Sequence, residues 1–122
     1  MTQEEKKLLT VALGGYFRFG VKMNCFDVPR KLLGLTIEDD FVTLDCGGEH
    51  FYYPFNNEMH TGVLPFLRPM SSMTDAERKE FYKLNFTDFH YERVDWLDEH
   101  KFDYRGLIPM GLAYEATEDM YD

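Results

Sequence analysis

Four short segments between residues 16 and 66 constrain the fold more than any other feature of this sequence. They are rich in β-branched and aromatic residues, and they read GVKMNCF, RKLLGLTI, FVTLDC and HFYYPF. The stretches that separate and follow them are DVPR, EDD, GGE and NNEMHTG. Because Gly, Pro, Asp and Asn favour turn conformations, this spacing predicts short antiparallel strands joined by brief connections.

Two of the segments carry finer information about the sheet. In FVTLDC, Val42 and Leu44 alternate with Thr43 and Asp45, which is typical of a strand with one buried face and one solvated face. Pro54 has no backbone amide to donate, so we expect it at an edge strand or a bulge.

A helix is predicted before the strand region. Thr2 and Glu5 have the spacing of a capping box, in which each side chain accepts a hydrogen bond from a free amide at the helix start. Apolar residues then recur at helical spacing, and Gly14-Gly15 follows. Since glycine accepts the left-handed conformation that ends many helices, we predict a helix over residues 2–13.

Two more helices are predicted after the strand region. Thr74 and Glu77 form a second capping box, which predicts a helix from about residue 74 to 84. The segment TDFHYERVDWLDEH predicts a third helix over residues 88–99, with an acidic outer face. Between the strands and these helices, Pro65 and Pro69 favour an extended crossover over a regular helix or a central strand.

The C-terminal segment HKFDYRGLIPMGLAYEA combines apolar residues with Gly, Pro and Arg. We expect Asp103 to cap a turn by accepting the amides of Arg105 or Gly106, and a helix to start or bend at Pro109. The apolar residues of this segment should close the core. The polar tail at residues 117–122 is expected to fray.

Length and composition agree with one folded domain over residues 1–122. The chain is 44% hydrophobic and 16% aromatic, which supplies enough apolar area for a core. We therefore predict an α+β fold, with an N-terminal helix, a small antiparallel four- to five-stranded barrel-like (SH3-like) sheet, and C-terminal helices.

The compartment and the cofactor content are predicted from what the sequence lacks. No apolar run approaches the roughly 18 residues of a membrane helix, and the N-terminus does not resemble a signal peptide. The two cysteines, Cys25 and Cys46, are expected to be reduced and buried. We predict a cytoplasmic protein of a bacterial host cell, with no membrane association, metal or other cofactor.

The charge distribution is uneven. The net charge is −9; residues 1–85 carry 12 acids and 10 bases (−2), and residues 86–122 carry 10 acids and 3 bases (−7). Because phosphates require Lys and Arg partners, direct nucleic-acid binding is not expected. The acidity is either a solvated face or a mimic of nucleic acid that occupies a basic protein surface. The residues that would form such a mimic are Asp88, Glu92, Asp95 and Asp98.

Catalytic motifs are not recognisable. His90 and His100 have acidic neighbours, but residues one or two positions apart on a helix do not converge on one ligand. The polar loop at residues 56–62 could hold a small ligand, and its candidates are Asn56, Asn57 and His60. The plainer interpretation of this segment is a connecting loop.

In the C-terminal segment, Tyr104 and Arg105 are the side chains that we single out as candidates for recognition. The expected structural role of Arg105 is to pair with an acid or to cover the carbonyls at the end of another element.

Both ends of the chain resemble a known family. The segments MTQEEKKLL, GVKMN, LRPMSSMTDAERKEF and above all FDYRGLIPMGLAYEA are similar to a family of small uncharacterised proteins of gut-bacterial genomes, their prophages and their phages. The resemblance covers about half of the chain, and it implies an intracellular, phage-associated setting. It implies no activity and no catalytic residue.

Three functions follow as hypotheses. We favour a non-catalytic protein-interaction module of a phage or mobile genetic element, with an unidentified protein partner. The first alternative is an acidic inhibitor or nucleic-acid mimic. The second is a small-ligand-binding protein or enzyme that uses the 56–62 loop.

Overall fold

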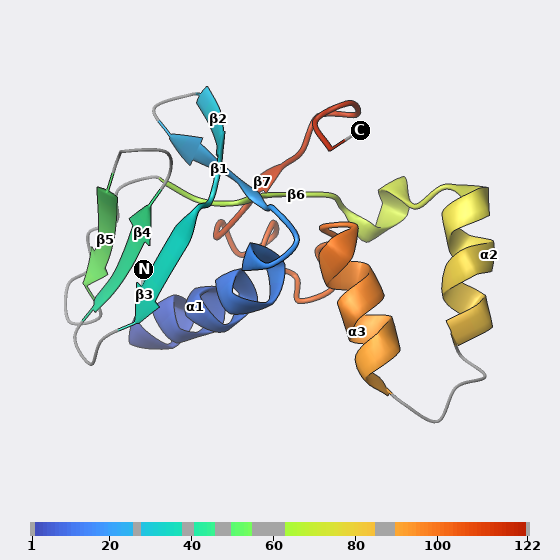
Figure 1. Ribbon diagram of the computed structural model, residues 1–122, viewed down its shortest axis with the longest axis horizontal. Coiled ribbons are helices and arrows are strands. Elements are labelled where there is room, and N and C mark those ends of the chain that lie inside the picture. The colour runs from blue at the N-terminus through green and yellow to red at the C-terminus, as the bar shows by residue number, and fades with distance from the viewer. Residues whose placement is uncertain are drawn as a thin grey trace.

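The chain forms an N-terminal helix, short strands, an extended crossover and C-terminal helices, so the predicted α+β class is confirmed (Figure 1). The computed structural model describes residues 2–25, 28–37, 41–45, 50–54, 63–84 and 90–121. Its elements are α1 (Gln3–Phe17), β1 (Lys22–Cys25), β2 (Val28–Lys31), β3 (Gly34–Ile37), β4 (Phe41–Asp45), β5 (His50–Pro54), β6 (Phe66–Leu67), the 3-10 turn η1 (Met70–Ser72), α2 (Asp75–Lys83), α3 (His90–Glu99) and β7 (Tyr114–Glu115).

The described strands form three separate sheets and no closed barrel, so the SH3-like detail of the prediction is not confirmed. β1 and β2 are an antiparallel hairpin, β3, β4 and β5 are an antiparallel meander, and β6 and β7 are a short parallel pair. β5 ends at Pro54 and has one partner strand, which places this proline at an edge as expected. In β4, Leu44 is fully buried and its neighbour Thr43 is not, in agreement with the predicted alternation.

The segment RKLLGLTI was predicted as one strand but contributes to two sheets. Its backbone changes partners within two residues: the Leu32 amide donates to Val21 O at 2.9 Å, and the Leu33 amide donates to Asp45 O at 2.7 Å. DVPR was predicted as a break, yet β2 begins at Val28. Pro29 is tolerated there because β2 is an exposed edge strand.

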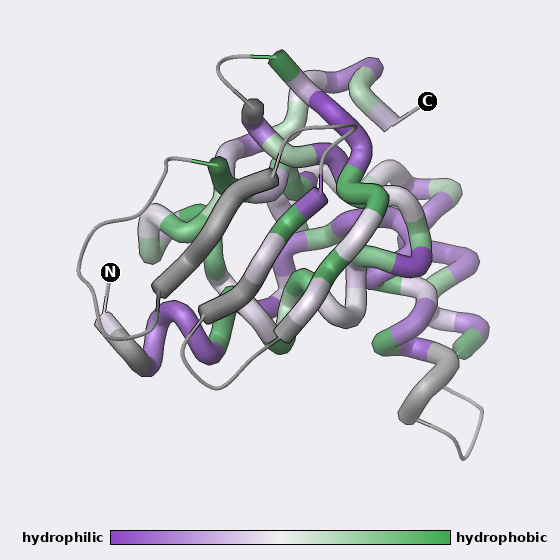
Figure 2. The backbone as a smooth tube through the Cα atoms, turned by 60° about the vertical axis from the view of Figure 1, so that its left-hand side comes forward, coloured by the Kyte–Doolittle hydropathy of each residue, from purple (hydrophilic) through white to green (hydrophobic). Residues whose placement is uncertain are grey.

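The first helix does not end at Gly14-Gly15; it continues to Phe17. The predicted capping box of Thr2 and Glu5 is present at its start. Tyr16, one residue past the glycines, is fully buried. Since α1 packs against both β3 and α3, and Asp98 of α3 lies against Gly15, tertiary contacts outweigh the local preference of glycine to end a helix. In Figure 2, α1 alternates between hydrophilic and hydrophobic stretches, as expected for a helix with one buried face.

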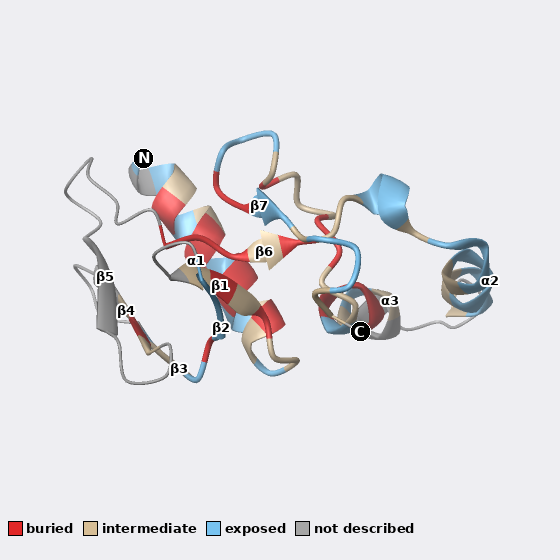
Figure 3. Ribbon diagram, turned by 90° about the horizontal axis from the view of Figure 1, so that it is seen from above, coloured by how far each residue is buried: buried red, intermediate tan, exposed pale blue. Residues whose placement is uncertain are grey.

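The two later helices are confirmed. α2 begins after Thr74 with the predicted capping box, and α3 ends at Glu99. Residue 88, where we expected α3 to begin, lies outside the described residues. None of the α2 residues is buried, and Figure 3 shows this helix without a buried segment. All described helices are too short or too polar to cross a lipid bilayer.

The crossover at residues 63–68 is extended, as the two prolines predicted. It lies between β1 and the C-terminal segment. On one side the amide of Asn24 in β1 donates to Leu64 O at 2.9 Å. On the other side the amide of Tyr114 donates to Pro65 O at 2.9 Å, and that of Ala116 donates to Leu67 O at 2.8 Å. The crossover therefore joins the N-terminal hairpin to the C-terminal segment (Figure 1).

Two clusters of buried residues stabilise the fold. The larger one packs α1 against the sheets, the crossover and the C-terminal segment; it contains Leu9, Ala12, Leu13, Tyr16, Val21, Met23, Leu32, Leu44, Val63, Leu64, Leu67, Leu107, Leu112 and Ala113. The smaller one lies between α2 and α3 and contains Trp96, Leu97 and Phe102.

The C-terminal segment closes the core, but through turns and not through a helix. Asp103 accepts the amides of Leu107 at 2.7 Å and Ile108 at 2.9 Å, so the capping role is confirmed with other partners than we expected. Pro109 lies in this series of turns, and the prediction of a helix start or bend there is wrong. Leu112 is buried.

The tail was expected to fray, yet Tyr121 attaches it to the crossover and to β1. The Tyr121 hydroxyl donates to Phe66 O at 2.7 Å and accepts the Lys22 amide at 2.8 Å. Its ring supplies apolar area, which the acidic composition of the tail does not suggest.

Candidate interaction groove

Tyr104 and Arg105, which we singled out for recognition, belong to a polar cluster around Asp98. The Tyr104 hydroxyl donates to Asp98 Oδ1 at 2.8 Å, and Arg105 Nη1 lies 3.2 Å from the same oxygen. The side chains of Arg105 and Asp98 are only 16% and 2% exposed. Both candidates are therefore engaged inside the protein, and recognition through either one is not favoured.

Asp98 was expected on the acidic outer face of α3, and this prediction is wrong. Its carboxylate points toward α1 at Gly15, where a methyl group would lie 2.8 Å from Asp98 Oδ2 and 3.1 Å from Arg105 Nη2. Gly15 thus leaves room for the buried ion pair. Burial of the ring and the hydrogen bond to Asp98 raise the pKa of Tyr104. The Tyr16 hydroxyl donates to the carbonyl of Phe102 nearby, and burial raises the pKa of Tyr16 as well.

Asp95 also has a partner, although it remains near the surface. It forms an ion pair with Arg18 at the C-terminal end of α1, with side chains that are 46% and 56% exposed. Two of the four acids proposed for a nucleic-acid mimic are therefore paired with arginines. Asp88, Asn56, Asn57 and His60 lie outside the described residues, as does the side chain of Glu92.

His100 packs in the small cluster. Its ring stacks on Trp96 with centroids 4.1 Å apart, and its Nδ1 lies 2.8 Å from Trp96 O. No group of three metal-ligating side chains occurs within the described ranges. The side chains of Cys25, His50 and His90 are not among those described.

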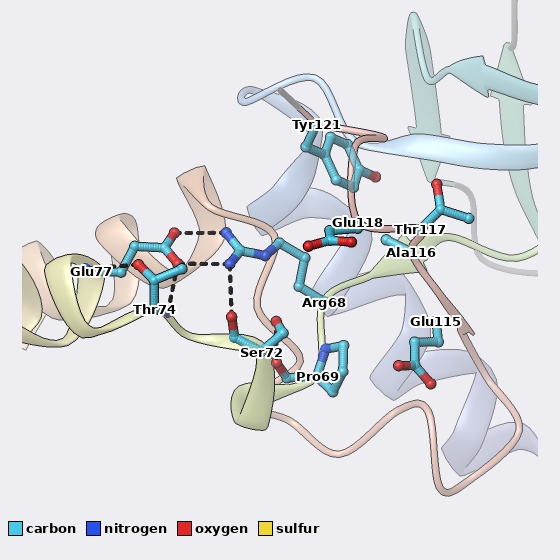
Figure 4. Close-up of a pocket in the computed structure, with 10 residues that line it drawn as sticks. All are labelled: Arg68, Pro69, Ser72, Thr74, Glu77, Glu115, Ala116, Thr117, Glu118 and Tyr121. Atoms are coloured by element: carbon cyan, nitrogen blue, oxygen red, sulfur yellow. Dashed lines mark hydrogen bonds and ion pairs between the residues drawn. The ribbon is translucent and has the colours of Figure 1, made fainter.

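An open groove of about 630 Å³ lies between the start of α2 and the C-terminal segment (Figure 4). One wall comes from the crossover, η1 and the first turn of α2, and the other from β7 and the tail. Its lining residues are Arg68, Pro69, Ser72, Thr74, Glu77, Glu115, Ala116, Thr117, Glu118 and Tyr121.

Arg68 and Glu77 fix one wall of the groove. Arg68 donates from both Nη atoms to the two carboxylate oxygens of Glu77, each at 2.7 Å, and its guanidinium lies 4.2 Å from the centroid of the Phe102 ring. Glu77 Oε1 also accepts the Thr74 amide at 3.0 Å, as part of the capping box. The hydrogen bonds from Arg68, together with that of Thr74, lower the pKa of Glu77 to about 2. The Glu77 carboxylate is therefore charged, and both of its oxygens already accept hydrogen bonds from within the protein.

Glu115 and Glu118 give the other wall a different character. Both residues are exposed, and neither side chain forms a hydrogen bond or ion pair with another described residue. Tyr121 closes the end of this wall through its contacts with β1 and the crossover. The groove therefore has one internally neutralised wall and one negatively charged wall.

The sequence held a partial indication of this site. The capping box located Glu77, but nothing in the sequence paired it with Arg68, nine residues earlier. Glu118 and Tyr121 lie in the polar tail at residues 117–122, which was expected to fray, and Glu115 lies at the end of the segment that was expected to close the core. Comparison of the chain with protein-family models, with curated proteins and with solved structures found no match.

Proposed function

We propose that this protein is a non-catalytic interaction module that accepts a basic, extended segment of a partner protein in the groove between α2 and the tail. The observation that carries the proposal is the charged wall: Glu115 and Glu118 face a volume of about 630 Å³ and have no partner among the described residues. A Lys or Arg side chain of a partner would supply the missing charge.

The shape of the groove supports an extended segment as its occupant. β7 is a two-residue strand with one described partner strand, β6, and its residues Tyr114 and Glu115 are exposed. Since β7 is extended and its side chains are exposed, a partner segment can run along it with its own side chains in the groove. The resemblance of both chain ends to a phage-associated family supports a phage or mobile-element setting for this partner.

The alternatives have less support. An acidic inhibitor that used the face of α3 would rely on Asp95 and Asp98, and both are paired with arginines. The hypothesis of a ligand site at the 56–62 loop concerns residues outside the described ranges. Within those ranges, the polar side chains of the Asp98 cluster are engaged with one another, which does not favour catalysis there.

A peptide-binding measurement tests the proposal. A fluorescent peptide of alternating Lys and Ala residues is titrated with the full chain at low ionic strength. The double variant Glu115→Gln with Glu118→Gln should bind it roughly tenfold more weakly, because each exposed charge pair contributes up to about 1 kcal/mol. The control is Glu4→Gln with Glu99→Gln, which removes the same charge from exposed positions outside the groove. Equal weakening in both variants would contradict a specific groove.

A further inference from the structure

Three lysines of this acidic chain lie near one another, and two of them, Lys22 and Lys101, lie beside the Tyr121 ring. Lys22 in β1 and Lys31 in β2 are direct partners in the antiparallel register, so their side chains lie on the same face of the hairpin. Lys101 follows α3. The Nζ atoms of Lys22 and Lys101 lie 5.7 Å and 5.1 Å from the centroid of the Tyr121 ring.

The backbone holds Lys101 in this place at a cost. Its φ is 59°. Among the described residues other than glycine, Lys101 alone has a positive φ. An L-residue in this conformation typically costs about 1 kcal/mol. The Lys101 backbone is fixed by its carbonyl, which accepts the Arg68 amide at 2.8 Å.

The positive charges of Lys22 and Lys31 act against the charged form of Lys101, and no described carboxylate forms an ion pair with any of the three. Burial lowers the pKa of Lys101, and the charges of Lys22 and Lys31 lower it further, while Glu99 acts in the opposite direction. None of the four ion pairs among the described residues includes these lysines. Lys22 Nζ donates to the carbonyl of Met120 at 2.7 Å, and a carbonyl carries no net charge.

This arrangement is unusual because the chain has 22 acids and 13 bases. Like charges placed opposite each other in a sheet are destabilising. An acid at any of the three positions would relieve the repulsion. A cluster of cations without a carboxylate partner is the arrangement expected where an external anion binds.

Open space borders Lys31, at one side of the cluster. A hollow of about 510 Å³ lies next to Lys31, lined by Phe17, Arg18, Phe19, Gly20, Lys31, Leu32 and Leu33. Gly20 has a φ of 79°, and a methyl group there would lie 3.2 Å from Lys31 Cε. Glycine at this position therefore allows the Lys31 side chain to lie across the backbone at the edge of the hollow.

We propose that Lys22, Lys31 and Lys101 form a binding site for a small phosphate-bearing anion. Lysine binds phosphate oxygens as a compact point charge with rotatable donors, so the site does not need the planar geometry of arginine. The net charge of −9 repels a long polyanion, whereas a compact anion experiences mainly the nearby lysines, since charges beyond about 8 Å are screened at physiological salt. None of the three lysines lines the proposed peptide groove, although Tyr121 borders both sites, and the anion proposal does not rest on the proposed function.

The test is a titration of the full chain with pyrophosphate at physiological ionic strength, followed by amide NMR shifts and by thermal unfolding. We expect the amides of Lys22, Lys31 and Lys101 to shift together and the melting temperature to rise. The double variant Lys31→Gln with Lys101→Gln should bind pyrophosphate at least tenfold more weakly. The matched control, Lys79→Gln with Lys83→Gln, removes two exposed lysines of α2 and should bind like the parent chain.

A second readout separates anion binding from a purely structural role. Without the anion, Lys31→Gln should slightly stabilise the fold, because it removes a like-charge contact. With the anion, the parent chain should gain stability that Lys31→Gln does not gain. Loss of stability in Lys31→Gln without the anion, with unchanged pyrophosphate binding, would overturn the proposal.

Two further arms identify the occupant. Asp122 follows Tyr121 and lies outside the described residues; if pyrophosphate binds to Asp122→Asn but not to the parent chain, the cluster serves the chain's own C-terminal acid and the proposal fails. Tighter binding of a twelve-nucleotide single-stranded DNA than of pyrophosphate would also overturn it, because the ligand would then be a polymer.

Discussion

The two halves of the molecule are stabilised in different ways. Among the described residues, the half around α1 has a cluster of fourteen buried hydrophobic residues that link the helix to the sheets, the crossover and the C-terminal segment. The corresponding cluster in the half around α2 and α3 has three, Trp96, Leu97 and Phe102. In the first half, removal of apolar area from water is the main source of stability. The second half adds specific polar contacts, namely the Arg68–Glu77 pair and a hydrogen bond of 3.1 Å from Trp96 Nε1 to Glu80.

The interface between the two halves, where α1 meets α3 and the residues that follow it, is polar. The carboxylate of Asp98 on α3 fits against Gly15 of α1, and the hydroxyl of Tyr16 donates to the carbonyl of Phe102. Charged groups at such a depth remain stable only when they are paired, and Arg105 supplies the pair. The large core therefore determines whether the chain folds, while polar contacts determine where α2 and α3 lie.

The largest effect should come from the main core. Leu13→Ala removes a fully buried side chain and should lower the free energy of unfolding by about 2–5 kcal/mol. Val11 on the same helix is 66% exposed, and Val11→Ala should change it by less than about 0.5 kcal/mol. Urea unfolding followed by circular dichroism measures both values. Similar losses in the two variants would contradict the assigned faces of α1.

The next effect concerns the interface between α1 and α3. Gly15→Ala places a methyl group against Asp98 and should cost about 1–3 kcal/mol. At Gly14 a methyl group meets nothing within 4 Å, so Gly14→Ala should stabilise the helix by about 0.5–1 kcal/mol. The opposite signs of these neighbouring substitutions, measured by thermal unfolding, report directly on the contact between α1 and α3. A gain in both would show that Asp98 does not lie against Gly15.

A smaller effect concerns the wall of the groove and depends on pH. Glu77→Gln should cost about 1–2 kcal/mol at neutral pH, because it weakens the charge-assisted hydrogen bonds with Arg68. The pKa of Glu77 is lowered from 4.5 to about 2 in the folded chain, so its contribution is present above pH 4.5 and is lost as the pH falls toward 2. The difference in stability between parent and variant should shrink over that window. Glu115→Gln serves as the control, and a constant difference for Glu77→Gln would refute the assignment.

The smallest effect on stability tests whether the two halves unfold independently. Thr74→Ala removes the N-cap of α2 and should cost about 1 kcal/mol. Because α2 contributes no buried residue, hydrogen exchange should accelerate in α2 while the amides of α1 stay protected. Thr2→Ala removes the equivalent cap of α1 and provides the comparison. Equal acceleration throughout the chain after Thr74→Ala would mean that the halves unfold as one unit.

The features that could be predicted are local. Both capping boxes involve residues three positions apart, and both are present. The alternation in β4 and the extended crossover also follow from short-range chemistry. The predictions failed where a distant partner decides the outcome: Gly14-Gly15 lies inside α1, and RKLLGLTI is divided between two sheets.

The candidate site was less predictable than the fold. The residues expected at a binding surface, Tyr104 and Arg105, are engaged with Asp98, which itself was expected at the surface. The groove forms from segments about fifty residues apart, around Arg68 and Glu118, and part of its acidic wall lies in the tail at residues 117–122, which was expected to fray. A short sequence motif cannot predict a groove that forms between segments so far apart in the chain.

The sequence by itself determined the α+β class, the starts of α1 and α2, the extended crossover and the closing role of the C-terminal segment, because each depends on neighbours along the chain or on the apolar content of one segment. The tertiary structure alone decided that Gly15 accommodates a buried carboxylate, that Tyr121 docks the tail, and that Lys22 and Lys101 lie beside its ring. The physical reason is that burial, ion pairing and charge repulsion depend on distances in space, and the chain brings these groups together only when the core has formed.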